Sequence, residues 1–490
     1  MRRAEDDAKG GRKGPKKVIQ MDWDDRPFYI RNESGAIERW TGYGGTLSGI
    51  KDKLPYLNDL GVTIIYLNPI FEAASSHRYD TADFMKIDPG LGDEESFTEL
   101  VNEAKKYGIR IILDGVFNHV GFDSVYFNGY GNYGEGGAAK DKDSPYYKWF
   151  NFESWPDKYD CWWGVTDLPA INENDPDYKE YICTGKDSVI RHWMRTGIGG
   201  FRLDVADELP DEFIEDIRRV MSEEDPESVL LGEVWEDASN KISYGIRRKY
   251  FRGKELNSVM NYPFRTGALD YLKGRITAGD FVASVMNQME NYPPENFAGN
   301  LNLIGSHDRE RALTLLGDAP DKDSLNDRQK ELYSLSDEQR QLAKKRMRLL
   351  VLIQFTLPGL PCIYYGDEAA MEGYTDPYNR GPYPWGKEDK ELTDYYKKII
   401  ALRKSEAVFT KGNYLPVAYT DDVYGCRRVY EDETVYVLVN ANTSQPREFD
   451  IFAPADTAVN LLNGDNIEAS VEKAHISLAP LEAIVLKFVH

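Results

Sequence analysis

The chain has 490 residues, three to four times the usual domain size, which predicts two or three domains. Hydrophobic residues make up 41% and charged residues 29%, a globular composition that excludes a collagen, a coiled coil or a wholly disordered chain. Asp and Glu outnumber Lys and Arg by 82 to 60, giving a net charge of −22. Because this field repels phosphate backbones and anionic lipid, we expect a neutral or cationic substrate, no nucleic acid and no membrane partner.

The first 17 residues carry seven Lys or Arg against three acids and have no apolar core. We therefore predict a disordered basic tail over residues 1–17, and neither a signal peptide nor an anchor. The cysteines are scattered and form no CxxC spacing, which favours a reducing, cytoplasmic compartment. They are Cys161, Cys183, Cys362 and Cys426.

From about residue 46 to 405, short β-branched runs alternate with amphipathic stretches, the pattern of repeated βα units around a parallel sheet. Seven strands are predicted within residues 63–70, 109–117, 199–207, 228–235, 258–263, 301–308 and 361–368. Helices are predicted at 47–60, 94–107, 211–222 and 338–356. Most strands lead into Asp, Glu, Asn or His, as expected at the active face of an α/β (β/α)8 TIM barrel.

Three segments differ from this pattern. The long apolar run at 349–365 contains Pro358 and Gly359, which split it into a buried helix end and a buried strand, not a membrane span. Residues 118–176 are irregular and rich in aromatic rings, which suit either sugar stacking or packing of the segment itself. Residues 407–490 alternate in polarity and predict an antiparallel β-sandwich. The barrel is thus assigned to 18–117 and 177–406, with an inserted domain at 118–176.

The strand GFRLDVAD places Arg202 and Asp204 on one face, since side chains alternate with a period of two. Its apolar face packs against helices, so the polar pair points into the barrel. We expect the nearby guanidinium to keep Asp204 ionised at neutral pH. Asp204 is then a candidate nucleophile, and the alternative is a buried Arg–Asp pair without chemistry.

The same alternation in VLLGEVW places Glu233 beside the ring of Trp235. An apolar neighbour favours the protonated form of a carboxyl group, which a general acid requires. Two carboxyl groups in opposed environments are what glycosidic bond cleavage needs. The alternative is that Glu233 only caps or solvates the following loop.

Three of the six histidines, His77, His119 and His307, lie at predicted strand ends. We interpret them as hydrogen-bond donors to sugar hydroxyl groups. A zinc site is the competing interpretation, but no HxH or HExxH spacing supports it. No cofactor and no metal are predicted.

In chain order, DGVFNH, GFRLDVADE, GEVW and SHD resemble the four signatures of the α-amylase superfamily, glycoside hydrolase family 13. WWGVTDLPAINENDP resembles the additional signature before the fourth strand. The resemblance covers nearly all of the chain after about residue 40. SHD, GEVWED and YDTADFMKIDPGLGDEESF look most like the group of neopullulanases, cyclomaltodextrinases and maltogenic amylases.

The resemblance implies a role for individual residues. Asp204 matches the nucleophile, Glu233 the acid/base, and Asp308 the third carboxylate that stabilises the oxocarbenium-like transition state. Arg202, His119 and His307 match the positions that surround the sugar at the cleaved bond. Tyr79 matches the ring that stacks on this sugar, and Arg380 matches a contact to the neighbouring sugar. Asn118 matches a position that binds structural calcium in many α-amylases; its partner ligands are not recognisable here.

The chain departs from that group at its start. Neither an N-terminal β-sandwich nor the usual motif of the first barrel strand precedes GYGGTLSGI. Either VIQMDW or PFYI serves as strand one, or the barrel is open there, so this strand is atypical or missing. Because the sandwich commonly mediates dimerisation in the group, we expect a monomer or a weak oligomer.

Two functions follow as hypotheses. The leading one is a retaining hydrolase of α-1,4 and also α-1,6 glucosidic bonds in maltodextrins, cyclodextrins or pullulan, with the two carboxyl groups roughly 5 to 5.5 Å apart. The alternative is a non-catalytic or truncated amylase-like barrel that binds carbohydrate. A phosphate-handling isomerase is disfavoured, since no Gly-rich anion loop follows the late strands.

Overall fold

The fold is taken from a computed structural model that describes residues 17–33, 35, 37–469 and 472–488. It divides into two compact units, one comprising Met1–Val234 with Ala238–Val259 and the other Trp235–Asp237 with Met260–His490. Residues 1–16 of the expected basic tail lie outside the described residues, and Lys17 begins a strand. The domain boundaries expected at 117, 176 and 406 stay predictions.

A five-stranded parallel sheet forms the centre of the first unit, and its strands have the order β14-β11-β10-β7-β4. The strands are β4 (Ile64–Leu67), β7 (Arg110–Gly115), β10 (Gly200–Leu203), β11 (Val229–Gly232) and β14 (Ser258–Val259). Each lies within a predicted strand and is shorter than it. Since all run in one direction, the polar residues after them collect at one edge of the sheet.

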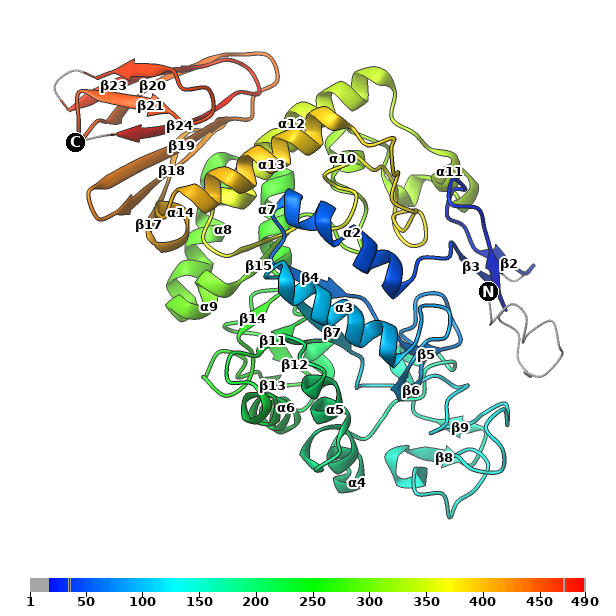
Figure 1. The fold of residues 1–490 in the computed structure, drawn as a ribbon. Coiled ribbons are helices and arrows are strands. Elements are labelled where there is room, and N and C mark those ends of the chain that lie inside the picture. Colours follow the sequence, from blue (N-terminus) through cyan, green and yellow to red (C-terminus); the bar gives the residue numbers. More distant parts are fainter. Residues whose placement is uncertain (1–16, 34, 36, 470–471, 489–490) are drawn as a thin grey trace. The chain divides into compact units, whose positions relative to one another are not determined.

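Helices cover this sheet, and capping side chains define where several of them begin. Thr46 accepts a hydrogen bond from the amide of Gly49, and Asp93 and Ser96 form a capping box. Figure 1 shows α2 and α3 side by side. The helices are α2 (Leu47–Leu60), α3 (Glu94–Lys106), α4 (Pro176–Lys179), η3 (Glu180–Thr184), α5 (Val189–Arg195), η4 (Ala206–Glu208) and α6 (Asp211–Glu224).

The N-terminal segment forms a separate small sheet with the order β1-β3-β2. It consists of β1 (Lys17–Gln20), β2 (Ile30–Arg31) and β3 (Ile37–Gly42). Neither of the two candidates for the first barrel strand pairs with β4 among the described residues. VIQMDW overlaps β1 and PFYI overlaps β2, and both of these strands pair with β3 instead. The sequence between residues 17 and 42 therefore supplies strands, but they do not extend the parallel sheet.

The irregular segment at 118–176 has little regular structure and is held together by aromatic rings. Tyr126, Phe127, Trp149 and Phe150 are buried, whereas Trp163 is exposed. The buried rings are candidates for packing of the segment itself, and the exposed ring of Trp163 is a candidate for sugar stacking. The short elements of the unit are β5 (Phe71–Ala73), β6 (Thr81–Ile87), η1 (Tyr147–Trp149), β8 (Phe152–Ser154), β9 (Lys158–Tyr159), η2 (Trp162–Gly164), β12 (Ile242–Ser243) and β13 (Ile246–Arg247).

The second unit contains a parallel strand pair, β15 (Leu301–Leu303) with β16 (Leu360–Cys362). The apolar run divides as predicted, since α12 ends at Thr356 and β16 follows the Pro358-Gly359 turn. Within the described chain, every helix is too short or too polar to cross a bilayer. The helices are α7 (Tyr262–Leu272), α8 (Ala278–Asn291), α9 (Pro294–Gly299), α10 (Ala312–Leu316), η5 (Lys322–Ser324), α11 (Asp327–Leu332), α12 (Asp337–Thr356), α13 (Lys390–Ser405) and α14 (Val408–Lys411).

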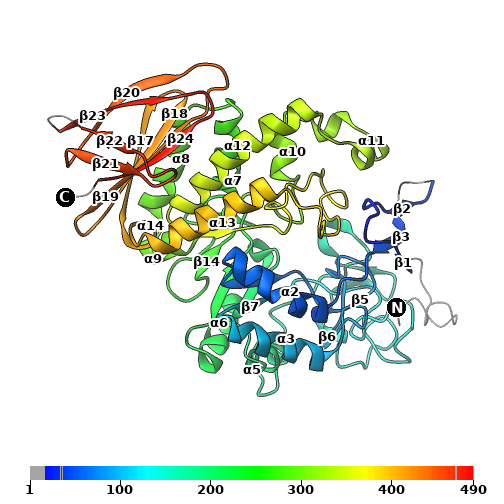
Figure 2. The same cartoon turned by 45° about the horizontal axis from the view of Figure 1, so that its top comes forward.

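The C-terminal part of this unit is antiparallel, with a six-stranded sheet facing a two-stranded one (Figure 2). The sheets have the orders β17-β18-β19-β24-β21-β22 and β20-β23. Leu438 and Leu486 of the larger sheet share one buried core with Ile451 and Ile476 of the smaller. The strands are β17 (Asn413–Thr420), β18 (Val423–Tyr430), β19 (Glu433–Asn440), β20 (Arg447–Phe452), β21 (Thr457–Asn460), β22 (Asn466–Glu468), β23 (Lys473–Leu478) and β24 (Ala483–Phe488).

Candidate active site

Three carboxyl groups collect at the carboxyl ends of neighbouring strands in the first unit. In the parallel register, Arg202 of β10 lies opposite Asp114 of β7 and Leu231 of β11. Asp204 follows β10 directly, and Glu233 follows β11. The sheet thereby places Asp114, Asp204 and Glu233 around the side chain of Arg202.

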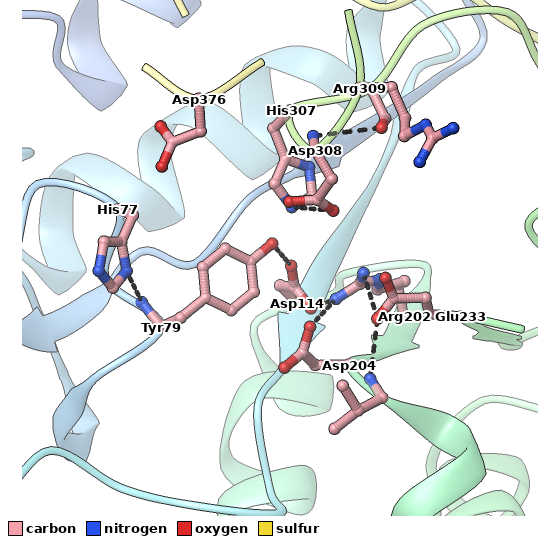
Figure 3. Close-up of polar contacts among 12 residues, drawn as sticks. His77, Tyr79, Asp114, Arg202, Asp204, Glu233, His307, Asp308, Arg309 and Asp376 are labelled. Atoms are coloured by element: carbon pink, nitrogen blue, oxygen red, sulfur yellow. Dashed lines mark hydrogen bonds and ion pairs between the residues drawn. The ribbon is translucent and has the colours of Figure 1, made fainter. Parts of the chain in front are cut away.

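Arg202 is fully buried and forms ion pairs with all three carboxylates. Its Nη1 lies 2.8 Å from Asp114 Oδ1 and 2.6 Å from Asp204 Oδ1, and its Nη2 lies 2.9 Å from Glu233 Oε2. Figure 3 shows the three contacts as dashed lines. The predicted pairing of Arg202 with Asp204 is confirmed, and the same guanidinium also holds Glu233.

One positive charge cannot balance three negative ones in a buried site, so the cluster favours binding a proton. Burial is the largest cause that raises the pKa of Asp204 well above its usual range, and the charge of Glu233 raises it further. Arg202 acts in the opposite direction and lowers it. Burial likewise raises the pKa of Asp114. Arg202 therefore acts on the pKa of Asp204 in the expected direction, but burial outweighs the guanidinium and the net shift is upward.

The backbone between the two carboxyl groups adds a further contact to Glu233. The amide of Val205 donates a hydrogen bond of 2.9 Å to Glu233 Oε2, and Val205 has φ 41° and ψ 52°. A β-branched residue rarely adopts this left-handed conformation, which is typical of strained functional sites. The prediction that strand alternation continues as far as Trp235 is wrong, because β11 ends at Gly232. Trp235 stacks instead on Tyr262, at 4.2 Å between ring centroids.

Asp114 connects the cluster to two tyrosines that come from other parts of the chain. It accepts a hydrogen bond of 2.6 Å from the hydroxyl of Tyr66 and one of 2.9 Å from that of Tyr79. Burial raises the pKa of both phenols well above the usual range. Sequence reasoning missed Asp114 and Tyr66. The available signal was the position of Asp114 as the first residue of DGVFNH, at the end of a strongly apolar strand.

The N-terminal sheet supports the loop that carries Tyr79. The amide of Tyr79 donates a hydrogen bond of 3.0 Å to His77 Nδ1, and their rings stack with centroids 6.0 Å apart (Figure 3). Trp40 of β3 contacts the His77 ring edge-on at 4.7 Å, and Tyr29 contacts Trp40 at 4.8 Å. His77 therefore acts as a bridge between β3 and the ring predicted to stack on the sugar.

His119 is buried beside the same loop. Its Nε2 lies 3.1 Å from the carbonyl oxygen of Tyr79, and its Nδ1 lies 3.3 Å from Asn118 Oδ1. Burial lowers its pKa to about 4, so the ring is neutral at pH 7 and cannot act as a cationic donor. The Asn118 amide donates to Glu173, whose pKa burial raises to about 8. Among the described residues, no group of three or more His, Cys, Asp or Glu is arranged to hold a metal ion.

The second unit contains the remaining predicted residues in a cluster of their own. His307 Nε2 lies 3.0 Å from Asp308 Oδ2, and Arg380 Nη2 lies 3.6 Å from Asp308 Oδ1. Arg380 also donates through Nε to the carbonyl of His307 and pairs with Asp376 at 3.1 Å. The structure thus brings the predicted His307, Asp308 and Arg380 together.

Asn379, which sequence reasoning missed, fixes the loop that carries Asp308. Its buried Nδ2 donates to three carbonyl oxygens, those of Ser306 (3.1 Å), His307 (2.8 Å) and Arg309 (2.8 Å). Arg311 is fully buried and donates to the carbonyl of Asn379 at 3.0 Å. These contacts specify the backbone from which Asp308 projects.

Known proteins are similar to this chain in sequence and fold. The family model described as "Alpha amylase, catalytic domain" matches residues 16–385. Amylopullulanase from Thermoanaerobacterium saccharolyticum is 36% identical over 86% of this chain, and the chain spans only 35% of that protein. Neopullulanase 2 from Thermoactinomyces vulgaris is 35% identical over 93% of this chain and 74% of its own length.

A solved structure shows the same architecture. The cyclic α-maltosyl-(1→6)-maltose hydrolase from Arthrobacter globiformis matches 96% of this chain and 98% of its own, with a TM-score of 0.76 and 26% identity. The expected fold class, a (β/α)8 barrel with a C-terminal antiparallel β domain, is thereby confirmed. The resemblance to the neopullulanase group is confirmed too. With its ordered motifs, its carboxylate cluster and a family match over three quarters of its length, the chain belongs to the α-amylase family of glycoside hydrolases.

Proposed function

We propose that this protein is a retaining glycoside hydrolase that cleaves α-1,4 and also α-1,6 glucosidic bonds of maltodextrins, cyclodextrins or pullulan. The observation that carries the proposal is the binding of Asp204 and Glu233 by the two terminal nitrogens of one buried guanidinium. This arrangement holds a nucleophile and an acid side by side, as a double displacement requires. Family membership and relatives named for α-glucan hydrolysis support the substrate class.

In the first step, a carboxylate oxygen of Asp204 attacks the anomeric carbon while Glu233 donates its proton to the leaving glycosidic oxygen. Arg202 holds Oδ1 of Asp204, so we assign the attack to Oδ2. In the second step, Glu233 takes a proton from water, and the resulting hydroxide displaces Asp204 from the sugar. The product keeps the α configuration, because each step inverts the anomeric carbon once.

The cluster of three carboxyl groups supplies the proton that this cycle needs. With one guanidinium among Asp114, Asp204 and Glu233, the charge balance of the cluster favours binding a proton. We assign that proton to Glu233 during catalysis, because the positive charge that develops on the sugar stabilises an ionised Asp204. Asp114 keeps its place through its two tyrosine hydrogen bonds.

The remaining residues are assigned to substrate binding. Tyr79 offers its ring as a stacking surface, and the neutral His119 offers a hydrogen-bond donor to a sugar hydroxyl. We assign Asp308 as the third carboxylate, with His307 and Arg380 binding and orienting it.

We also expect the protein to be a monomer or a weak oligomer, and light scattering of the purified protein measures this.

The test uses maltotriose, β-cyclodextrin and pullulan with wild type, Glu233→Gln, Asp204→Asn and the control Glu153→Gln, which changes an exposed carboxyl group. We expect each active-site variant to lose at least about a hundredfold in kcat and the control to be unchanged. NMR of the first product should show the α-anomer. A β-anomer, or full activity of Glu233→Gln, would overturn the proposal. Stabilisation by maltoheptaose without turnover would favour the non-catalytic alternative.

A further inference from the structure

The short segment Trp235–Asp237 follows the proposed acid closely in the chain and yet packs with the second unit. Residues up to Val234 belong to the first unit, whereas this segment groups with Met260–His490. Two residues of fully extended chain span at most about 7 Å. The position of the Trp235 backbone therefore limits where the backbone of Glu233 can lie.

Two side chains of the second unit hold the ring of Trp235. The ring stacks on that of Tyr262, the first residue of α7, with centroids 4.2 Å apart and planes 5° from parallel. Tyr262 is buried, so it offers a fixed surface. The guanidinium carbon of Arg309 lies 5.2 Å from the centroid of the Trp235 ring. Stacked rings and a cation over an indole both attract, and together they restrain this ring.

Arg309 is placed for this contact by its own backbone. Its carbonyl oxygen accepts a hydrogen bond of 2.8 Å from Asn379 Nδ2, and its side chain points away from the carboxylate of Asp308 (Figure 3). Within the described part of the chain, the guanidinium forms no ion pair and its buried Nε has no hydrogen-bond partner. Since arginine ordinarily pairs with carboxylates or stacks on rings, the ring of Trp235 is the contact that accounts for this side chain.

Helix α8 holds the other end of the segment. Asn287 Nδ2 donates a hydrogen bond of 2.7 Å to Asp237 Oδ2. Asn287 lies on α8, and this helix packs against α7, which carries Tyr262. The segment Trp235–Asp237 therefore has an anchor at each end, and both anchors belong to the same pair of helices and to the loop of Arg309.

Glu233 depends on such an anchor for the direction of its proton. Its Oε2 accepts a hydrogen bond of 2.9 Å from the Val205 amide and lies 2.9 Å from Arg202 Nη2. Because two donors engage Oε2, the proton of the acid belongs on Oε1. The Glu233 amide donates to the carbonyl of Leu203 at 3.0 Å, which fixes the backbone on one side. The next anchor along the chain is Trp235.

We propose that Arg309, Tyr262 and Asn287 are positioning residues for the acid/base Glu233, which they fix through the segment Trp235–Asp237. This role rests on the proposed function, in which Glu233 protonates the leaving oxygen. A displaced acid slows the departure of a leaving group that needs a proton, and it matters little for a leaving group that departs as a stable anion. A general loss of structure would slow both.

The test compares kcat/KM for maltotriose, whose leaving group is a sugar, with kcat/KM for α-maltosyl fluoride, which releases fluoride. Arg309→Met should lower the maltotriose value about tenfold through kcat, with less than about a twofold change for the fluoride. Arg309→Lys keeps a cation over the ring and should recover most of the loss. Asn287→Ala removes an exposed contact and should lower the maltotriose value about threefold. Arg348→Met is the matched control, because this guanidinium lies 5.6 Å from the ring centre of Tyr395, far along α12 from the loop of Asp308 in the chain.

Glu233→Gln provides the reference, since it should lose at least about a hundredfold on maltotriose and far less on the fluoride. If Glu233→Gln shows this selectivity but Arg309→Met and Asn287→Ala slow both substrates equally, or neither, the positioning role is overturned and the proposed function stands. A wild type that does not hydrolyse maltotriose, or a Glu233→Gln that is slowed equally on both, overturns the proposed function and the role with it. Circular dichroism shows whether each variant is folded, and Asn287→Ala decides if Arg309→Met is not.

Discussion

Replacing Arg202 by methionine removes the positive charge that binds three buried carboxylates at 2.6 to 2.9 Å. Breaking a buried ion pair by removing one partner costs about 3–5 kcal/mol of unfolding free energy. The carboxyl groups can relieve part of this cost by binding protons. Since Arg202 lowers the pKa of both Asp114 and Asp204, its loss raises both pKa values further. The destabilisation should therefore depend on pH.

The direction of this pH dependence follows from proton binding. A carboxyl group whose folded pKa is raised above its unfolded value of about 3.9 stabilises the fold fully below that value, and this contribution is lost as pH rises through the folded pKa. For Arg202→Met, the loss relative to wild type should be small near pH 4 and reach about 3–5 kcal/mol at neutral pH. Each additional bound proton contributes up to about 1.4 kcal/mol per pH unit.

The assay is urea unfolding at pH 5, 6, 7 and 8, followed by circular dichroism. Arg110→Met is the matched control, because Arg110 pairs with Asp225 at 2.7 Å with both side chains more than a third exposed. We expect the control to lose at most about 1 kcal/mol, with little dependence on pH. The reasoning is refuted if Arg202→Met loses the same free energy at every pH, or no more than the control. The acidic limb of the pH profile of kcat/KM should also move to higher pH in Arg202→Met.

Three further predictions concern single side chains. Burial raises the pKa of Glu173 to about 8, so ionisation of this group destabilises the fold as pH rises from about 4.5 to 8. The variant Glu173→Gln should therefore have the melting temperature of wild type near pH 5 and a higher one than wild type at pH 9. Asn379→Leu leaves three buried carbonyls without their donor, and should lower the unfolding free energy by about 2–4 kcal/mol and reduce kcat through the loop of Asp308. Trp40→Ala should reduce kcat/KM several-fold in wild type but not in a Tyr79→Ala background, because its ring acts through the loop of that tyrosine; equal effects in both backgrounds would contradict this.

The sequence by itself determined the features that depend on near neighbours in the chain. The predicted helix at 47–60 has the bounds of α2, because an apolar periodicity, a Thr46 cap and a terminal Gly61 all agree there. The pairing of Arg202 with Asp204 follows from strand alternation over two residues. The carboxyl groups at 204 and 233 were found because parallel strands collect their polar ends at one edge.

Only the tertiary structure decided what depends on residues far apart in the chain. Asp114 receives Tyr66, Tyr79 and Arg202 from separate elements, and no local pattern encodes that meeting. The direction of the Asp204 pKa was missed because burial is set by every element that covers the sheet, whereas the guanidinium is visible two residues away. Strand pairing is likewise non-local, which is why the N-terminal strands could be expected but their partner β3 could not. Short-range periodicity fixes which side chains share a face, and long-range packing fixes their partners and their charge.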